Sequence, residues 1–169
     1  AQQAEESKIM RYQAQAAVLE LEEAEQDESL AWKPRLEEAI EQGHFRLHYQ
    51  PIVSLHGKEQ QLYEVLIRMV NSENGALIQA ETFIQYAMQY ELMNVIDKWV
   101  ISTALKSLIA HQERFPKTRF FIKLSKQTLC DAEFVDWLDA VLNEHQLKGE
   151  CFTFEVSETD ALAYIDETK

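Results

Sequence analysis

Hydrophobic and polar positions alternate in four stretches of the chain, and each stretch predicts a β-strand. The four stretches are FRLHYQPIV (45–53), QLYEVLIRMV (61–70), TRFFIKLS (118–125) and CFTFEVS (151–157). Between them, apolar residues recur at helical spacing in three segments, 80–93, 94–111 and 131–147, and a helical tail is predicted from Glu158. The segment SLHGKEQ reads as a turn, so the first two strands are predicted to form an antiparallel hairpin.

Strands that alternate with helices of a dozen or more residues indicate right-handed β-α-β units, and hence a parallel sheet or barrel. An eight-stranded β/α barrel usually needs about 250 residues. This chain has 169 residues and four predicted strands. The sequence therefore predicts an α/β fold, a partial (β/α) barrel whose first strand is antiparallel, preceded by an N-terminal linker helix.

The linker helix is predicted from residues 1 to about 30, which are rich in Ala, Gln and Glu and contain no Gly or Pro. A heptad seam runs for only about two repeats, through Ile9, Tyr12, Ala16 and Leu19. Three or four repeats are needed for a coiled coil. A solvated linker helix and a dimerising helix therefore both stay open.

Pro34 is predicted to end this run, because proline breaks a helix interior. A short helix should follow and stop at Gly43, with Leu36, Ala39 and Ile40 on its apolar face. The predicted organisation is a linker helix over 1–33 and a barrel half over 34–169.

Composition narrows the classes of partner. The chain carries 29 acidic and 16 basic residues, a net charge of −13, which argues against nucleic-acid polymers and anionic membranes as partners. A small anionic ligand could still bind a local basic site. No stretch of 18 apolar residues exists, so membrane insertion is not expected.

The two cysteines and the N-terminus indicate the compartment. Cys130 and Cys151 lack CxxC spacing and clustered histidines, which favours a reducing compartment over a zinc site or a disulfide framework. The N-terminal AQQAEESKIM has no apolar signal core and no initiator Met. We therefore expect a cytoplasmic segment cut from a longer protein.

Candidate chemistry lies where three strands end, in EVLIR, IKLS and FEVSE. In a β/α barrel the C-terminal ends of the strands carry the active site. Glu64, Leu66 and Arg68 alternate along one strand and must share a face, with Glu64 and Arg68 roughly 13 Å apart, too far to neutralise each other. Charges inside apolar strands are costly unless they are paired or bind something, so a ligand site is predicted.

These motifs, taken in order, resemble a known family. FRLHYQPIVSLHG, YEVLIRM, FIQYAMQYELMNVIDKWVI, FIKLSKQTL and FEVSE resemble the first half of an EAL domain, the family of cyclic di-GMP phosphodiesterases and receptors. The resemblance runs from about residue 36 to the end. EVL in place of Glu-Ala-Leu, with SLHG before it and KLS after it, is similar in particular to the degenerate FimX-like branch of the family.

The resemblance implies roles for individual residues. The ligand-binding set would be Gln50, Leu66, Arg68 and Asp97, with Arg68 on a phosphate of the dinucleotide. Glu64, Lys123 and Glu155 would form a vestigial metal site, and Glu158 would steady an active-site loop.

Lys123 is the decisive departure from active members, which carry a metal-binding asparagine at this position. A charged ammonium has no lone pair and opposes a nearby divalent cation. We therefore expect Lys123 to replace the metal between Glu64 and Glu155. Met88 also stands where active members carry a glutamate, and Lys169 ends the chain before their paired aspartates, catalytic lysine and later glutamate.

Three functions follow as alternatives. The first is a catalytically inactive cyclic di-GMP receptor with no cofactor, for which the FimX likeness implies a PilZ-type adaptor partner and control of type IV pili and twitching motility. The second is a phosphodiesterase in the full-length parent, using Mg or Mn. The third is a protein-interaction or dimerisation module with a vestigial site. Because four strands leave open edges, we also expect a homodimer or a domain-exchanged oligomer.

Overall fold

The computed structural model describes residues 26–53, 55, 61–147 and 149–158. Its strands are β1 (Phe45–Ile52), β2 (Leu62–Val70), β3 (Leu77–Gln79), β4 (Arg119–Lys123) and β5 (Phe152–Glu155). Its helices are one over residues 26–42, α2 (Ala80–Gln89), α3 (Met93–Gln112), α4 (Lys126–Leu129), α5 (Phe134–Glu144) and the 3-10 turn η1 (Gly149–Cys151). The heptad seam, and the tail beyond Glu158, lie outside the described residues.

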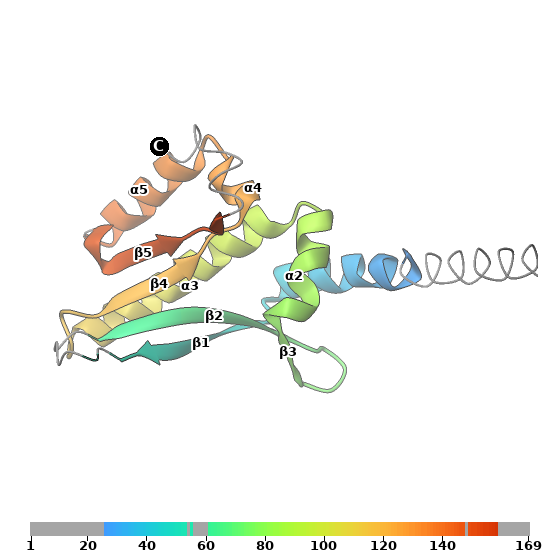
Figure 1. Cartoon of the computed structure of the whole chain (residues 1–169), viewed down its shortest axis with the longest axis horizontal. Helices are drawn as coiled ribbons and strands as arrows, with labels where there is room; N and C mark the ends of the chain where they lie inside the picture. The colour runs from blue at the N-terminus through green and yellow to red at the C-terminus, as the bar shows by residue number, and fades with distance from the viewer. Residues whose placement is uncertain (1–25, 54, 56–60, 148, 159–169) are drawn as a thin grey trace, which may run out of the picture.

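The strands form one sheet in the order β1-β2-β4-β5 (Figure 1). β1 and β2 are antiparallel, whereas β2, β4 and β5 run parallel to one another. The predicted α/β class with an antiparallel first strand is confirmed. β1 and β5 end this strand order, so the described part of the chain forms an open sheet rather than a closed barrel.

β3 was not predicted. It pairs antiparallel with the C-terminal end of β2, matching Arg68 with Gln79 and Val70 with Leu77. The connecting loop is tightened by a hydrogen bond from Asn71 N to Ala76 O of 2.8 Å, and Gly75 adopts a positive φ of 73°. Three residues are too few to show a period-two pattern, so nothing in the sequence distinguished this strand from a loop.

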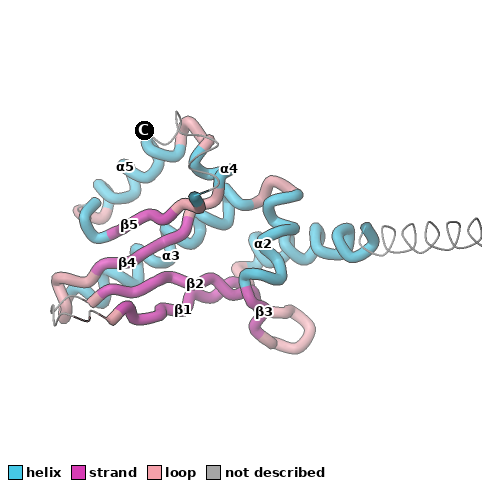
Figure 2. The backbone as a smooth tube through the Cα atoms, viewed as in Figure 1, coloured by secondary structure: helices cyan, strands magenta, loops and turns pink. Residues whose placement is uncertain are grey.

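The core lies on one face of the sheet, where α3 runs behind β2 and β4 (Figure 2). Val65, Ile67 and Met69 of β2 are buried, as the alternation predicted, while Glu64, Leu66 and Arg68 are only half-buried. From α3, Ile101, Leu105 and Leu108 are fully buried against them. The polar face of β2 is thus turned away from the covering helix.

The predicted helix break at Pro34 is wrong, because the helix runs through it from 26 to 42. Trp32 and Leu36 lie on either side of the exposed Pro34 and are 6% and 0% exposed. Trp32 stacks on Tyr86 of α2 with ring centroids 5.2 Å apart. An interior proline costs about 3 kcal/mol. Burying a leucine contributes about 1.5–3 kcal/mol and a tryptophan more, which outweighs that cost.

The helix predicted over 131–147 is shorter than expected, and a separate turn of helix, α4, precedes it. Ser125 caps α4 by accepting a hydrogen bond from Thr128 N at 3.3 Å. α5 then packs beside β5, where the Phe134 and Phe154 rings meet edge to face at 6.3 Å. None of the helices in the described ranges combines the length and apolar character needed to cross a bilayer.

Candidate ligand-binding face

The strand register gathers most of the predicted site residues on the sheet face opposite the core. Residues directly across an antiparallel pair share a face. Across β1 and β2, Gln50 stands opposite Glu64, and Arg46 stands opposite Arg68. Leu66 lies between them, opposite His48. Gln50, Glu64, Leu66 and Arg68 are therefore neighbours on one surface. Alternation along the strand predicted the shared face of Glu64, Leu66 and Arg68, and the β1–β2 register adds Gln50 to it.

The same surface continues across the parallel strands. Glu64 is level with Phe121 of β4, which is level with Thr153 of β5. One step further along, Lys123 is level with Glu155. We call this surface the open face; it consists of the even-numbered residues of β1 and β2 and the odd-numbered residues of β4 and β5. Phe121 and Thr153 were not predicted, although strand parity alone identifies them once the pairing is known.

The open face is locally cationic. It carries four basic residues and two carboxylates: Arg46, Arg68, Arg119 and Lys123 against Glu64 and Glu155. The whole chain, by contrast, has a net charge of −13. A positive surface on an acidic chain favours a small anion over a polyanion, because the remaining surface repels extended negative charge.

Arg68 is held in place by its own strand. Its Nη1 donates to the carbonyl oxygen of Ile67 at 2.8 Å. A guanidinium has five N–H donors in a rigid fork, so this bond occupies one of them and orients the rest. Arg46 is tied down in a similar way, with Nη1 donating to Phe45 O at 2.7 Å.

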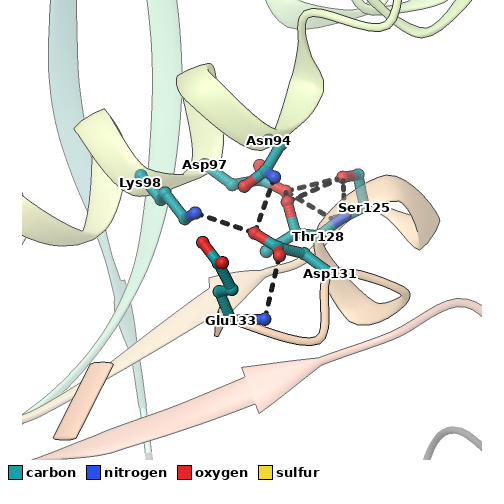
Figure 3. A network of polar contacts seen from close by, with 7 residues as sticks. All are labelled: Asn94, Asp97, Lys98, Ser125, Thr128, Asp131 and Glu133. Carbon is teal, nitrogen blue, oxygen red and sulfur yellow. Dashed lines mark hydrogen bonds and ion pairs between the residues drawn. The ribbon is translucent and has the colours of Figure 1, made fainter. Parts of the chain in front are cut away.

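Asp97 does not lie on the open face. It belongs to α3, is 4% exposed, and its Oδ2 accepts hydrogen bonds from Ser125 N at 2.9 Å, Ser125 Oγ at 2.7 Å and Thr128 Oγ1 at 2.7 Å (Figure 3). Burial raises the pKa of the Asp97 carboxyl, and these hydrogen bonds lower it in part. Its role as a direct ligand contact stays a prediction, since the structure uses this oxygen within the fold.

A second carboxylate, Asp131, lies in the same region at the end of α4 (Figure 3). Its Oδ2 accepts from Lys98 Nζ and from Asn94 Nδ2, both at 2.7 Å, and its Oδ1 accepts from Glu133 N at 3.0 Å. These bonds, led by the one from Lys98, lower the pKa of Asp131 to about 2. No local pattern in the sequence indicates this cluster, because Asp131 lies 33 positions from Lys98 and 37 positions from Asn94 along the chain.

Comparison with known proteins places the chain in a family. The profile of the EAL domain matches residues 34–169, which is most of the chain. The chain belongs to the EAL domain family.

Individual relatives agree with this placement. Over 142 residues the chain is 32% identical to "Cyclic di-GMP phosphodiesterase PdeF" of Escherichia coli, covering 84% of this chain and 19% of that protein. Among solved structures, the FimX EAL domain of Pseudomonas aeruginosa bound to c-di-GMP is 34% identical with a TM-score of 0.72, covering 82% and 54% of the two chains. The FimX EAL domain of Xanthomonas citri in complex with c-diGMP is 26% identical with a TM-score of 0.74, covering 86% and 56%. The chain thus spans about half of these EAL domains and about a fifth of PdeF.

The predicted vestigial metal site of this EAL chain lies on the open face, where Lys123 is level with Glu155. Within the described ranges, no three His, Cys, Asp or Glu residues come together as a metal site would require. The ion pairs found there are Lys33–Glu37 and Lys98–Asp131, so Lys123 Nζ is more than 4.0 Å from the carboxylate oxygens of Glu64 and Glu155. Lys123 stands beside Glu155 without pairing, and its replacement of a metal stays a prediction. Glu158 is exposed at the end of the described chain.

The Lys98–Asp131 pair predicts acid sensitivity. Because the pKa of Asp131 is about 2 in the fold against 3.8 ordinarily, its contribution to stability is present above about pH 4 and lost as the pH falls towards 2. Asp131→Asn should therefore lower the melting temperature at pH 7, and the difference from wild type should shrink over that interval. Asp139→Asn, which removes an exposed carboxylate of α5, is the control and should show no such convergence. A difference that stayed constant from pH 7 to pH 2 would contradict this prediction.

Proposed function

We propose that this EAL chain is a catalytically inactive receptor for cyclic di-GMP. The observation that carries the proposal is the position of Lys123, level with Glu155 on the open face. A charged lysine cannot ligate a metal, and it adds positive charge where a phosphate diester would lie. Support also comes from the relatives, since the FimX EAL domains that resemble this chain were solved with c-di-GMP bound.

The ligand's chemistry matches the open face. A cyclic dinucleotide has two phosphates, which suit Arg68, and two bases, which suit the apolar side chain of Leu66 and the aromatic ring of Phe121. Gln50 adds an amide that can donate and accept, so it can read a base edge. Each of these residues belongs to a paired strand, so the surface is preorganised for binding.

Calorimetric titration of the intact protein with cyclic di-GMP tests the proposal. We expect the dissociation constants measured in magnesium and in EDTA to agree within about twofold, because the protein needs no metal to bind. Incubation with Mg or Mn should leave the cyclic dinucleotide intact. Binding that disappears in EDTA, or metal-dependent conversion to the linear dinucleotide, would refute a receptor without catalysis.

A second candidate, phosphodiesterase activity in the whole protein, is favoured by the names of relatives such as PdeF. It requires a set of metal ligands, and no three His, Cys, Asp or Glu residues come together within the described ranges. Lys123→Asn restores the amide oxygen that active members use, yet we expect no measurable hydrolysis from this variant, because Met88 also departs from their pattern. Turnover by the Lys123→Asn variant would show that this lysine alone blocks catalysis.

Partners beyond the dinucleotide are also proposed. By likeness to FimX, the receptor would act on type IV pili and twitching motility through a PilZ-type adaptor protein. Within the described residues, β1 and β5 end the strand order, and the outer edge of an end strand can pair with another chain. We therefore expect the chain to dimerise through these edges, by exchange of elements or through its N-terminal segment. Sedimentation at tens of micromolar should show a dimer, and a folded monomer would contradict this.

A further inference from the structure

The turn between α2 and α3 contains a strained residue. Glu91 follows the end of α2 and has a φ of 57°. Residues other than glycine rarely adopt this left-handed conformation, and they keep it only where the surrounding structure holds them. Leu92 N closes the turn by donating to Ala87 O at 2.8 Å. The position of this turn therefore depends on the segments that pack against it.

The helix over 26–42 holds the turn from one side. Ser29 is 9% exposed, and its Oγ donates to Gln89 Oε1 at 3.0 Å. The hydroxyl of Tyr90 lies 2.8 Å from Ser29 Oγ and can donate to it. Lys33 Nζ also lies over the Tyr90 ring, 5.7 Å from its centroid. These contacts join the helix to the last residues of α2, directly before the strained residue.

Gln127 of α4 holds the same turn from the other side. Its Nε2 donates to Met88 O at 2.7 Å, and its Oε1 accepts from Met93 N at 3.1 Å. Met88 lies in the last turn of α2, and Met93 is the first residue of α3. One side-chain amide thus bonds a carbonyl at the end of one helix and an N–H at the start of the next, which are groups that helix geometry leaves short of partners. We call these two bonds of Gln127 the latch.

The latch reaches the segments that carry two residues of the predicted site. Asp97 lies in the second turn of α3, and Lys123 ends β4 four positions before Gln127. Within the described residues, the hydrogen bonds to Asp97 all end on Oδ2, so Oδ1 stays available for the direct ligand contact that the family resemblance implies. The bonds of Asp97 to Ser125 join α3 to the start of α4, and the latch adds the link from these two helices to α2.

We propose that the latch couples the helix over 26–42 to the dinucleotide site, so that docking of this helix on α2 strengthens the binding of cyclic di-GMP. The coupling rests on the proposed receptor function and adds a regulatory input to it. In the docked state, the helix and Gln127 hold the turn at Glu91 from both sides. When the helix leaves α2, the strained turn relaxes, the latch bonds are lost, and the start of α3 is held less firmly beside the end of β4. Coupling between two sites is reciprocal, so bound dinucleotide also strengthens the docking of the helix.

Amide hydrogen exchange tests the structural half of this proposal without ligand. Gln127→Leu keeps the approximate side-chain size and removes both latch bonds, whereas Ser29→Ala removes the hydroxyl that bonds the end of α2. We expect the Met93 amide to exchange at least about threefold faster in both variants, because Ser29 acts on Met93 through the turn. Glu28→Ala changes an exposed neighbour of Ser29 and should leave the rate unchanged. A wild-type rate at Met93 in Ser29→Ala would overturn the coupling.

A double-mutant cycle on cyclic di-GMP binding by the intact protein tests the functional half. Ser29→Ala should raise the dissociation constant about three- to tenfold in the wild-type background but less than about 1.5-fold in Gln127→Leu. An equal loss of affinity in both backgrounds would overturn the coupling. If Gln127→Leu fails to fold, Gln127→Glu replaces it, since a carboxylate keeps the acceptor for Met93 N and loses only the donor to Met88 O.

The two halves separate the possible failures. If the wild-type protein binds no cyclic di-GMP, the proposed function fails, and the exchange rate of the Met93 amide still decides whether the helix over 26–42 acts on the latch. If the wild type binds and the cycle is additive, the receptor function stands and the coupling is refuted.

Discussion

Replacing Leu36 with alanine should lower the free energy of unfolding by about 2–5 kcal/mol. Leu36 is fully buried in the helix over 26–42, within the same apolar core as Phe45 and Phe83. Truncation removes the transfer free energy of the lost carbons and leaves a cavity that the surrounding strands and helices fill only partly. Urea unfolding followed by far-ultraviolet circular dichroism measures the change.

The matched control lies in the same helix. Leu30 is 64% exposed, so Leu30→Ala should change the free energy of unfolding by no more than about 0.5 kcal/mol. The contrast between two leucines of one helix isolates burial from helix propensity, because the substitution is the same. Equal and small effects at Leu30 and Leu36 would show that this helix does not pack on the EAL sheet, and would undermine the continuity of the helix through Pro34.

Strand parity explains why so much of the open face could be predicted from sequence. Glu64, Leu66 and Arg68 share a face because strand side chains alternate. Val65, Ile67 and Met69 lie on the opposite face and are buried in the core. This constraint is local and depends on no other part of the chain. The family resemblance added Gln50, whose place opposite Glu64 depends on the β1–β2 register.

Other features depended on interactions that local patterns do not encode. The helix continues through Pro34 because of its contacts with α2, including the stacking of Trp32 on Tyr86. The helix propensity of proline describes only the local chain and does not include such tertiary contacts. The bonds between Asp97 and the Ser125 segment join residues 28 to 31 positions apart, so only the fold shows them. The short helix α4 was missed for a different reason, since its N-cap residue Ser125 is of a type that favours helix starts and is visible in the sequence.

Truncating Arg68 to alanine should raise the dissociation constant for cyclic di-GMP by a factor between about 30 and a few thousand. Removing one partner of a desolvated, hydrogen-bonded charge pair costs about 2–5 kcal/mol, and each 1.4 kcal/mol is a factor of ten. The hydrogen bond to Ile67 O already orients the guanidinium of Arg68, so binding a phosphate costs little additional side-chain entropy. Calorimetric titration of the intact protein gives the ratio of dissociation constants.

Arg46→Ala is the control that separates a specific contact from general charge. Arg46 stands opposite Arg68 in the β1–β2 register, on the same face, and its replacement removes the same unit of charge. Arg46 is exposed, so salt and water screen its attraction for the ligand, and we expect a loss below about fivefold. Arg68→Lys keeps the positive charge but loses the planar, two-pronged guanidinium. Its loss of affinity should therefore lie between those of Arg46→Ala and Arg68→Ala. If Arg46→Ala and Arg68→Ala weakened binding equally, the open face would attract the dinucleotide only through its summed charge, and Arg68 would have no distinct role.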